Sequence, residues 1–204
     1  GIEGLKILNN SELSEYEPSL DKNYEITALL APSGAIVDSL DFLKTVANDA
    51  ESLDARYIFD FPVERIERDS GGFALYSDKG HEIFVDYVIN AAGLYADKIA
   101  HLMSAGMEFE VIPFRGEYME VEGLELKSMI YHIPDKKHPF LGVHLTPTVA
   151  GGVIAGPTAS LSFGRESYDK GINWKEAKEM LKTQNFWRMA LRPETLKLYL
   201  KNRK

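Results

Sequence analysis

The sequence predicts an α+β fold, in which a mixed or antiparallel sheet is accompanied by helices and by a separate β-meander. Three observations support this fold class. Apolar positions recur at helical spacing over residues 39–52. Four short segments of strand character, separated by Gly-containing turns, predict the meander: 57–61, 63–68, 73–77 and 82–85. Four later segments of the same character predict the sheet: 109–121, 129–133, 140–146 and 152–155.

The remaining elements follow from local signals along the chain. Residues 26–30 read as a short strand closed by a Pro-Ser-Gly turn, and the helix at 39–52 can be capped by Asp38 or Ser39. A buried strand at 87–90 is expected to lead into a helix over about 95–103.

Two further helix starts are expected near the end of the chain. Asn173 opens a helix with a capping box completed by Glu176, and Leu181 should share the helix face of Ala177. Pro193 suits the first position of a last helix.

Composition narrows the class of protein. The 204 residues, 45% of them hydrophobic, suffice for one or two domains with a core. With 23 Lys and Arg against 31 Asp and Glu, the net charge of -8 disfavours a nucleic-acid partner. The absence of cysteine excludes a disulfide scaffold and Cys-ligated metals, and the five histidines show no metal-ligand spacing. We expect a cytoplasmic location, with peripheral membrane contact as the open alternative.

The sequence Val88-Ile-Asn-Ala-Ala-Gly-Leu-Tyr-Ala-Asp97 contains the feature that best indicates a ligand. Its small residues leave the backbone uncovered where strand is expected to give way to helix, so a flat cofactor could lie against it. In open α/β sheets, ligands bind beyond the carboxyl ends of strands, where this turn should lie. The alternative is a tight strand-to-helix connection with no ligand.

Several motifs together resemble a known family. They are Val88 to Asp97, Ile112-Pro-Phe-Arg-Gly-Glu-Tyr118, Phe140-Leu-Gly-Val-His-Leu-Thr146, Ala155-Gly-Pro-Thr-Ala159 and Arg165-Glu-Ser-Tyr168. With them the chain resembles the D-amino-acid-oxidase-like group of FAD proteins, and within it the hydroxyglutarate dehydrogenase branch. Thr158 departs from that branch, where Asn is expected.

The resemblance implies a domain organisation. Residues 1–35 would connect to the substrate domain, 36–104 would form part of an FAD-binding domain, and 105–204 would form the substrate-binding domain. The Gly-x-Gly-x-x-Gly loop that holds the FAD pyrophosphate in this group occurs nowhere in the sequence. We therefore expect a middle segment of a larger FAD enzyme, lacking the amino-terminal unit and the carboxy-terminal region, and inactive and without FAD by itself.

The resemblance also implies cofactor contacts. The backbone of Val63 would meet the adenine of FAD, and Ala91, Ala92 and Gly93 would lie against the cofactor. The alternative for Val63 is a buried strand residue with no ligand.

A histidine suits the base of such an enzyme because its unperturbed pKa is near 6.5. His144 is the candidate, since the strand that holds it resembles the substrate wall of the group. A core histidine with satisfied hydrogen bonds is the alternative.

Four residues are candidates for binding the substrate: Arg115, Tyr118, Thr146 and Arg165. Arg115 would hold a carboxylate or line the flavin face, or else pair with a structural acid such as Glu117. Strand alternation places Arg115 and Tyr118 on opposite sides unless a bulge intervenes. Arg165 would bind the distal carboxylate of a dicarboxylic acid, or would instead be solvated or salt-bridged.

The implied reaction converts a small 2-hydroxy acid, similar to L-2-hydroxyglutarate, to the 2-oxo acid, with hydride transfer to FAD and an electron acceptor of unknown identity. Three alternatives stay open. The parent could be an FAD-linked glycerol-3-phosphate dehydrogenase or an amino-acid oxidase of the same group, or the chain could be a binding module without catalysis.

Overall fold

The computed structural model describes residues 2–20, 26–133, 142–169, 171–193 and 195. They group into two compact units, each discontinuous in sequence. Unit 1 contains residues 1–55 and 116–159, and unit 2 contains residues 56–115 and 160–204. The expected α+β class is confirmed, because every strand ladder in the described residues is antiparallel and helices occur in both units.

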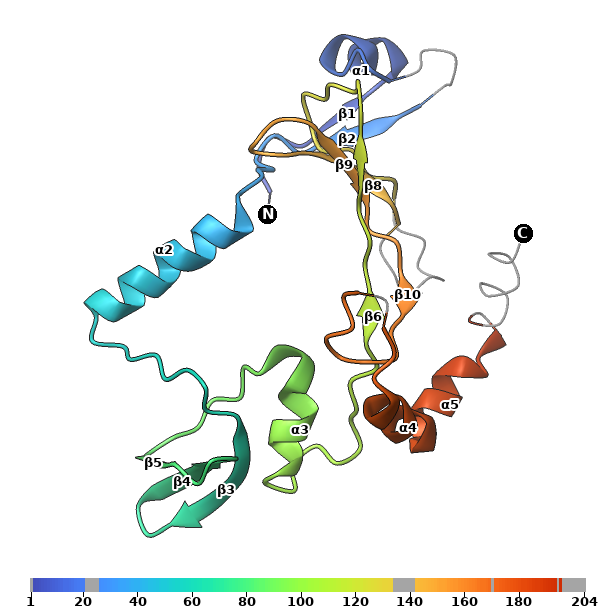
Figure 1. The fold of residues 1–204 in the computed structure, drawn as a ribbon. Coiled ribbons are helices and arrows are strands. Elements are labelled where there is room, and N and C mark those ends of the chain that lie inside the picture. Colours follow the sequence, from blue (N-terminus) through green and yellow to red (C-terminus); the bar gives the residue numbers. More distant parts are fainter. Residues whose placement is uncertain (1, 21–25, 134–141, 170, 194, 196–204) are drawn as a thin grey trace. The chain divides into compact units, whose positions relative to one another are not determined.

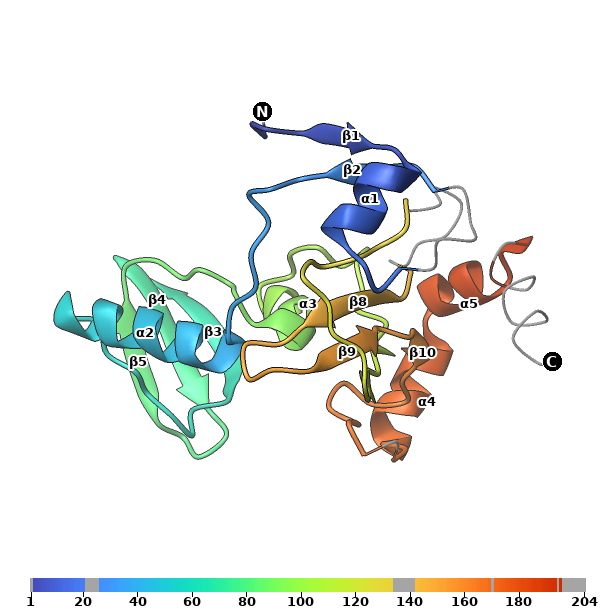
Figure 2. The same cartoon turned by 90° about the horizontal axis from the view of Figure 1, so that it is seen from above.

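Unit 1 combines an antiparallel pair of strands, two helices and a three-stranded sheet (Figure 1). Its elements are β1 (Lys6–Leu8), α1 (Asn10–Tyr16), β2 (Ala28–Leu30), α2 (Ser39–Ser52), β7 (Met119–Val121), β8 (His144–Pro147) and β9 (Val153–Gly156). β9 is the central strand of the sheet, in the order β7-β9-β8, and Figure 2 shows β8 and β9 side by side. The predicted strands at 26–30 and 152–155 are thus confirmed as β2 and β9, to within a residue or two at their ends.

Capping decides where the helices of unit 1 begin. Asp38 accepts hydrogen bonds from Leu40 and Asp41 N–H, which confirms the predicted start of α2. Asn9 and Glu12 form a full capping box at α1, a helix that the mixed sequence there did not predict. At the end of α1, Glu17 is 2% exposed and accepts hydrogen bonds from two backbone N–H groups of residues 127–128.

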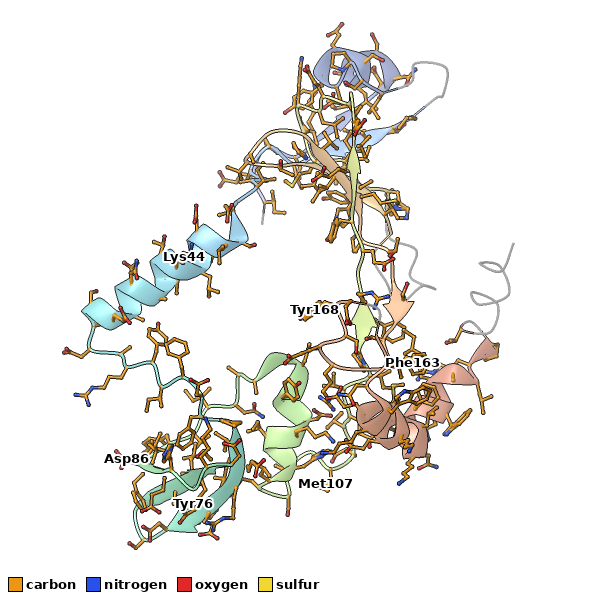
Figure 3. The ribbon with its side chains drawn as sticks, in the orientation of Figure 1. Lys44, Tyr76, Asp86, Met107, Phe163 and Tyr168 are labelled. Carbon is orange, nitrogen blue, oxygen red and sulfur yellow. The ribbon has the colours of Figure 1, made fainter. Side chains whose placement is uncertain are left out.

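The helix α2 packs little within unit 1. None of its residues is buried, and its apolar positions Leu40, Leu43 and Val46 are between 49% and 64% exposed. Figure 3 shows its side chains, including Lys44, projecting on all sides of the helix. The helix is therefore amphipathic in sequence without a covered apolar face among the described residues.

Unit 2 contains three of the four predicted strands of the β-meander, at 63–68, 73–77 and 82–85, which are confirmed as a sheet in the order β3-β4-β5. Its elements are β3 (Val63–Asp69), β4 (Gly72–Ser77), β5 (Glu82–Val85), the 3₁₀ turn η1 (Gly93–Tyr95), α3 (Ala96–His101), β6 (Phe114–Arg115), β10 (Ser160–Leu161), α4 (Trp174–Lys182) and α5 (Gln184–Ala190). The buried apolar residues of this unit include Ile66 and Ala74 in the meander strands, and Ala177, Met180 and Phe186 in α4 and α5.

Two predicted strands are wrong. Residues 57–61 and 87–90 have no strand structure, and Ile89 is 89% exposed rather than buried. A strand forms only when a neighbour satisfies its N–H and C=O groups. Among the described residues no strand pairs with either segment, so apolar sequence alone does not produce one.

The long strand expected at 109–121 is also wrong, because it is divided into β6 and β7. The break falls at Gly116, where a Cβ would lie 2.9 Å from Pro157, and at Glu117, whose N–H and C=O both bond Thr158. Residues 129–133 contribute only a bridge between Ile130 and Leu145.

The predictions for α4, near the end of the chain, were confirmed only in part. Asn173 caps α4 as predicted, but Glu176 accepts a hydrogen bond from Arg165 N–H instead of completing a capping box. Ala177 and Leu181 lie four residues apart in α4 and so share a helix face as predicted, although Ala177 is 3% exposed and Leu181 is 41% exposed. The division into segments 1–35, 36–104 and 105–204 concerns likeness to cofactor and substrate domains, and it stays a prediction.

Candidate functional site

The turn of residues 91–93 is open, as its sequence suggested. Ala91 and Gly93 are exposed and Ala92 is half-buried. Gly93 adopts a φ of 53°, and a Cβ there would meet nothing within 4 Å. The exposed Asn90 braces the turn, since its side chain accepts from Ala92 N–H at 3.2 Å and donates to the Ala96 carbonyl at 2.8 Å. The backbone of the turn is therefore available to a flat ligand.

A buried ion pair lies directly after this turn. Arg165 donates from Nη1 and Nη2 to the two carboxylate oxygens of Asp97, at 2.6 and 2.7 Å. The two side chains are only 9% and 5% exposed. The structure thus gives Arg165 the salt-bridged role that the sequence left open as the alternative to binding a substrate carboxylate.

The environment of Asp97 stabilises its ionised form. Burial alone would raise the pKa of this carboxyl, but hydrogen bonds from Arg165 and from the N–H groups of Val111 and Lys98 outweigh burial and lower its pKa to about 2. The pair is therefore charged on both sides at neutral pH.

A small cavity of about 80 Å³ lies beside the ion pair, between α3, α4 and residues 110–113. Phe163, labelled in Figure 3, contributes to its wall. Glu110 also lines it, and one carboxylate oxygen of Glu110 is buried without a hydrogen-bond partner in the described part of the chain. Space for only a few water molecules excludes this cavity as a site for an organic acid.

Val63 begins β3 at an irregular point of the meander. It pairs with Ser77, and the register shifts between Val63 and Arg65, which indicates a bulge. The guanidinium of Arg65 lies 3.5 Å from the centre of the Tyr76 ring, which Figure 3 labels. Val63 is half-buried, and its backbone lies next to the irregular register of the strand.

In unit 1, the sheet orients His144. Its Nδ1 lies 3.1 Å from the carbonyl oxygen of Gly142, and since a carbonyl only accepts, Nδ1 is the donor; in a neutral ring Nε2 is then the acceptor nitrogen. His144 is half-buried, and the Tyr118 ring meets its imidazole edge-on, with centroids 6.5 Å apart and planes at 72°. Thr146, two residues along β8, is half-buried and shares the strand face of His144.

Gly156 makes the approach of Tyr118 and His144 possible. It is the Cα partner of His144 in the sheet, and a Cβ on it would lie 2.5 Å from Tyr118 Cδ1 and 2.8 Å from the Glu117 oxygen. Any larger residue would push the tyrosine ring away from the strand.

The structure separates the candidates that the sequence treated together. His144, Tyr118 and Thr146 belong to unit 1, whereas Arg115 belongs to unit 2, where its Nη1 donates to the Ser167 carbonyl at 2.9 Å. The cofactor candidates Val63, Ala91, Ala92 and Gly93 also belong to unit 2.

Sequence reasoning missed the importance of two residues, Asp97 and Gly156. Asp97 lay within the quoted motif, and an acidic residue in the first turn of a helix could have drawn notice. Nothing in sequence indicates that Gly156 would face a tyrosine ring.

The comparison with known families decides the affiliation of the chain. Residues 1–188 match the model of the family described as FAD dependent oxidoreductase (DAO). The chain belongs to this family. That match confirms the resemblance on which the flavin interpretation depends, and it covers most of both units.

Relatives of known function share about a third of the sequence. An L-2-hydroxyglutarate dehydrogenase of Indibacter alkaliphilus is 33% identical over 93% of this chain and 48% of its own length. The mitochondrial L-2-hydroxyglutarate dehydrogenase of Mus musculus is 34% identical over 82% of this chain and 39% of its own length. The chain therefore spans half or less of the length of these relatives.

Solved structures give the same fold affiliation. The L-alpha-glycerophosphate oxidase from Mycoplasma pneumoniae, a structure with FAD bound, superposes with a TM-score of 0.70 at 26% identity, covering 82% of this chain and 44% of that one. The L-proline dehydrogenase from P. horikoshii superposes with a TM-score of 0.66 at 19% identity, over 88% of this chain and 47% of that one. In the described residues, no helix is both long and apolar enough to cross a membrane.

Proposed function

We propose that the chain is part of an FAD-dependent dehydrogenase that oxidises a small 2-hydroxy acid, similar to L-2-hydroxyglutarate, to the 2-oxo acid. The observation that carries this proposal is the orientation of His144, whose Nδ1 donates to the Gly142 carbonyl, which makes Nε2 the acceptor of the neutral ring, and whose imidazole meets the Tyr118 ring. Sequence identity of 33–34% to L-2-hydroxyglutarate dehydrogenases supports the choice of substrate.

The residues present fit an FAD cofactor. Ala91 and Gly93 are exposed, Ala92 is half-buried, and a Cβ at Gly93 would meet nothing within 4 Å, while Val63 offers a backbone position beside a bulge. We assign these four residues to cofactor binding. FAD supplies the hydride acceptor of the reaction, and the protein supplies orientation and proton transfer.

His144 would act as the base of this reaction. Its Nε2 takes the proton of the substrate hydroxyl, and the hydrogen bond from Nδ1 to Gly142 holds the ring in the required tautomer as the imidazolium forms. Tyr118 and Thr146 would orient the substrate from neighbouring positions of the same sheet.

Arg115 would bind a substrate carboxylate. A guanidinium has five N–H donors, and the bond from Nη1 to Ser167 fixes one part of it. A planar, permanently charged group suits a carboxylate better than a lysine does. An electron acceptor, whose identity stays open, would complete the catalytic cycle.

Glycerol-3-phosphate oxidation is the second candidate function, and likeness to the glycerophosphate oxidase structure favours it. The test is anaerobic bleaching of the flavin in the holoenzyme by L-2-hydroxyglutarate, D-2-hydroxyglutarate, glycerol 3-phosphate and amino acids. We expect bleaching by the L-hydroxy acid alone. Bleaching by glycerol 3-phosphate or an amino acid would replace the proposal with one of the other activities.

The same experiment separates an enzyme from a binding module. A holoprotein whose flavin none of these compounds reduces, but which binds one of the acids in calorimetry, would overturn catalysis and favour a binding role.

A further inference from the structure

We propose that Asp97 and Arg165 form a positioning pair, which holds the turn of residues 91–93 in the shape that receives the flavin. This inference rests on the proposed FAD site, and it adds a role for Asp97 and Arg165 in shaping that site. It assigns Arg165 to the cofactor rather than to the substrate.

The turn needs an external support because its own side chains cannot provide one. Ala91, Ala92 and Gly93 carry at most a methyl group, and Gly93 has a positive φ with open space around it. Glycine loses more conformational freedom on folding than any other residue, so a bare turn is costly to keep in one shape. Within the turn's own segment, the exposed Asn90 contributes two hydrogen bonds, to Ala92 N–H and to the Ala96 carbonyl.

Arg165 supports the turn from the buried side chain of a distant segment, through several contacts with the residues that follow the turn. Its Nη1 bonds the carbonyl oxygen of Leu94, and both of its terminal nitrogens bond Asp97. Its guanidinium carbon also lies 5.6 Å from the centre of the Tyr95 ring. One planar side chain thus fixes the end of η1 and the start of α3.

Both partners are themselves held in place. The backbone N–H of Arg165 donates to Glu176 Oε2 at 2.7 Å, and Glu176 stands in the first turn of α4. Asp97 Oδ2 accepts from Val111 N–H at 3.0 Å. The turn is therefore connected to α4 and to the segment before β6 through charge-assisted hydrogen bonds, which are shorter and stronger than neutral ones.

A surface ion pair provides a matched control. Lys98 and Glu179 join α3 to α4 directly, at 2.8 Å, but their side chains are 48% and 45% exposed. If the turn only needs α3 and α4 to stay together, breaking either pair should affect flavin binding alike. If it needs the guanidinium on Leu94 and Asp97, only the buried pair should matter.

The experiment measures FAD binding to flavin-free protein prepared from the holoenzyme, by quenching of flavin fluorescence, together with the visible circular dichroism of bound flavin and the Tm. The variants are Asp97→Asn, Arg165→Lys and the control double variant Lys98→Gln with Glu179→Gln. We expect the Kd for FAD to rise roughly 10-fold or more in the first two, within the usual range of coupling between sites. Their dichroism should change, whereas the control should match the wild type.

Each outcome has a defined meaning. A normal Kd and dichroism in Asp97→Asn, with only a lower Tm, would show a purely structural pair and overturn the inference. If Asp97→Asn does not fold, Arg165→Lys decides, because lysine keeps the charge but cannot form the forked contact. Wild-type protein that binds no FAD would instead refute the proposed function on which the inference rests.

Discussion

The sheet around His144 and the turn of residues 91–93 hold their candidate groups by different means. In the sheet, regular antiparallel pairing sets the positions of His144 and Tyr118, and one missing side chain at Gly156 admits the tyrosine ring. At the turn the backbone itself is the candidate group, and a buried ion pair from distant sequence supports it. The first site depends on steric fit and the second on electrostatics, so different substitutions should disable them.

The largest effect is expected from breaking the buried pair at the turn. Asp97→Asn leaves Arg165 charged and buried without its carboxylate, which costs about 3–5 kcal/mol when one partner of such a pair is removed. Denaturant unfolding of the holoenzyme should show this loss of stability. If the free energy of unfolding falls no more than in an ordinary surface substitution, solvent reaches the pair and the prediction is wrong.

The same pair gives a pH dependence. The pKa of Asp97 is lowered from 3.8 to about 2, so its stabilising contribution is complete above pH about 4 and is lost as the pH falls toward 2. The difference in unfolding free energy between wild type and Asp97→Asn should therefore shrink over this interval and stay constant from pH 5 to 7. A difference that instead grows on acidification would contradict the assigned charge state.

The next effect tests the chemistry of the sheet. His144→Ala should lower kcat by ~10²-fold or more if Nε2 is the base. The variant should still bind flavin, because His144 is not among the residues assigned to the cofactor, and the visible flavin spectrum checks this. A folded variant with unchanged turnover would leave His144 a structural residue.

A smaller effect should follow from filling the space at Gly156. In Gly156→Ala, the added methyl group would collide with the Tyr118 ring and the Glu117 oxygen, which costs about 1–3 kcal/mol and displaces the ring. We expect lower stability and a lower kcat/KM. Gly71→Ala is the matched control, because a Cβ at Gly71 meets nothing within 4 Å.

These regions also show what sequence can and cannot predict. The helix at α2 and its Asp38 cap were predicted correctly because periodicity and capping are local signals. The strand at 87–90 was predicted wrongly because pairing depends on a neighbour that the segment does not specify.

The candidate site divides in the same way. The openness of the turn at residues 91–93 could be predicted from residue size alone. The role of Arg165 could not, because it is 68 residues away from Asp97 and only the folded chain selects its partner among many acidic residues. The ring contact between Tyr118 and His144 likewise depends on a glycine in the strand between them.

The smallest effect should come from the exposed pair of Lys98 and Glu179, which joins α3 to α4. The hydrogen bond from Lys98 lowers the pKa of Glu179, but solvent reaches both side chains. A double-mutant cycle with Lys98→Gln and Glu179→Gln should give a coupling of only about 0.2–1 kcal/mol. Added salt should reduce it further, whereas the coupling of the buried pair should hardly respond. The buried pair differs from this exposed pair in its burial and in its forked, two-bond contact, and these are the properties that allow Asp97 and Arg165 to position the turn.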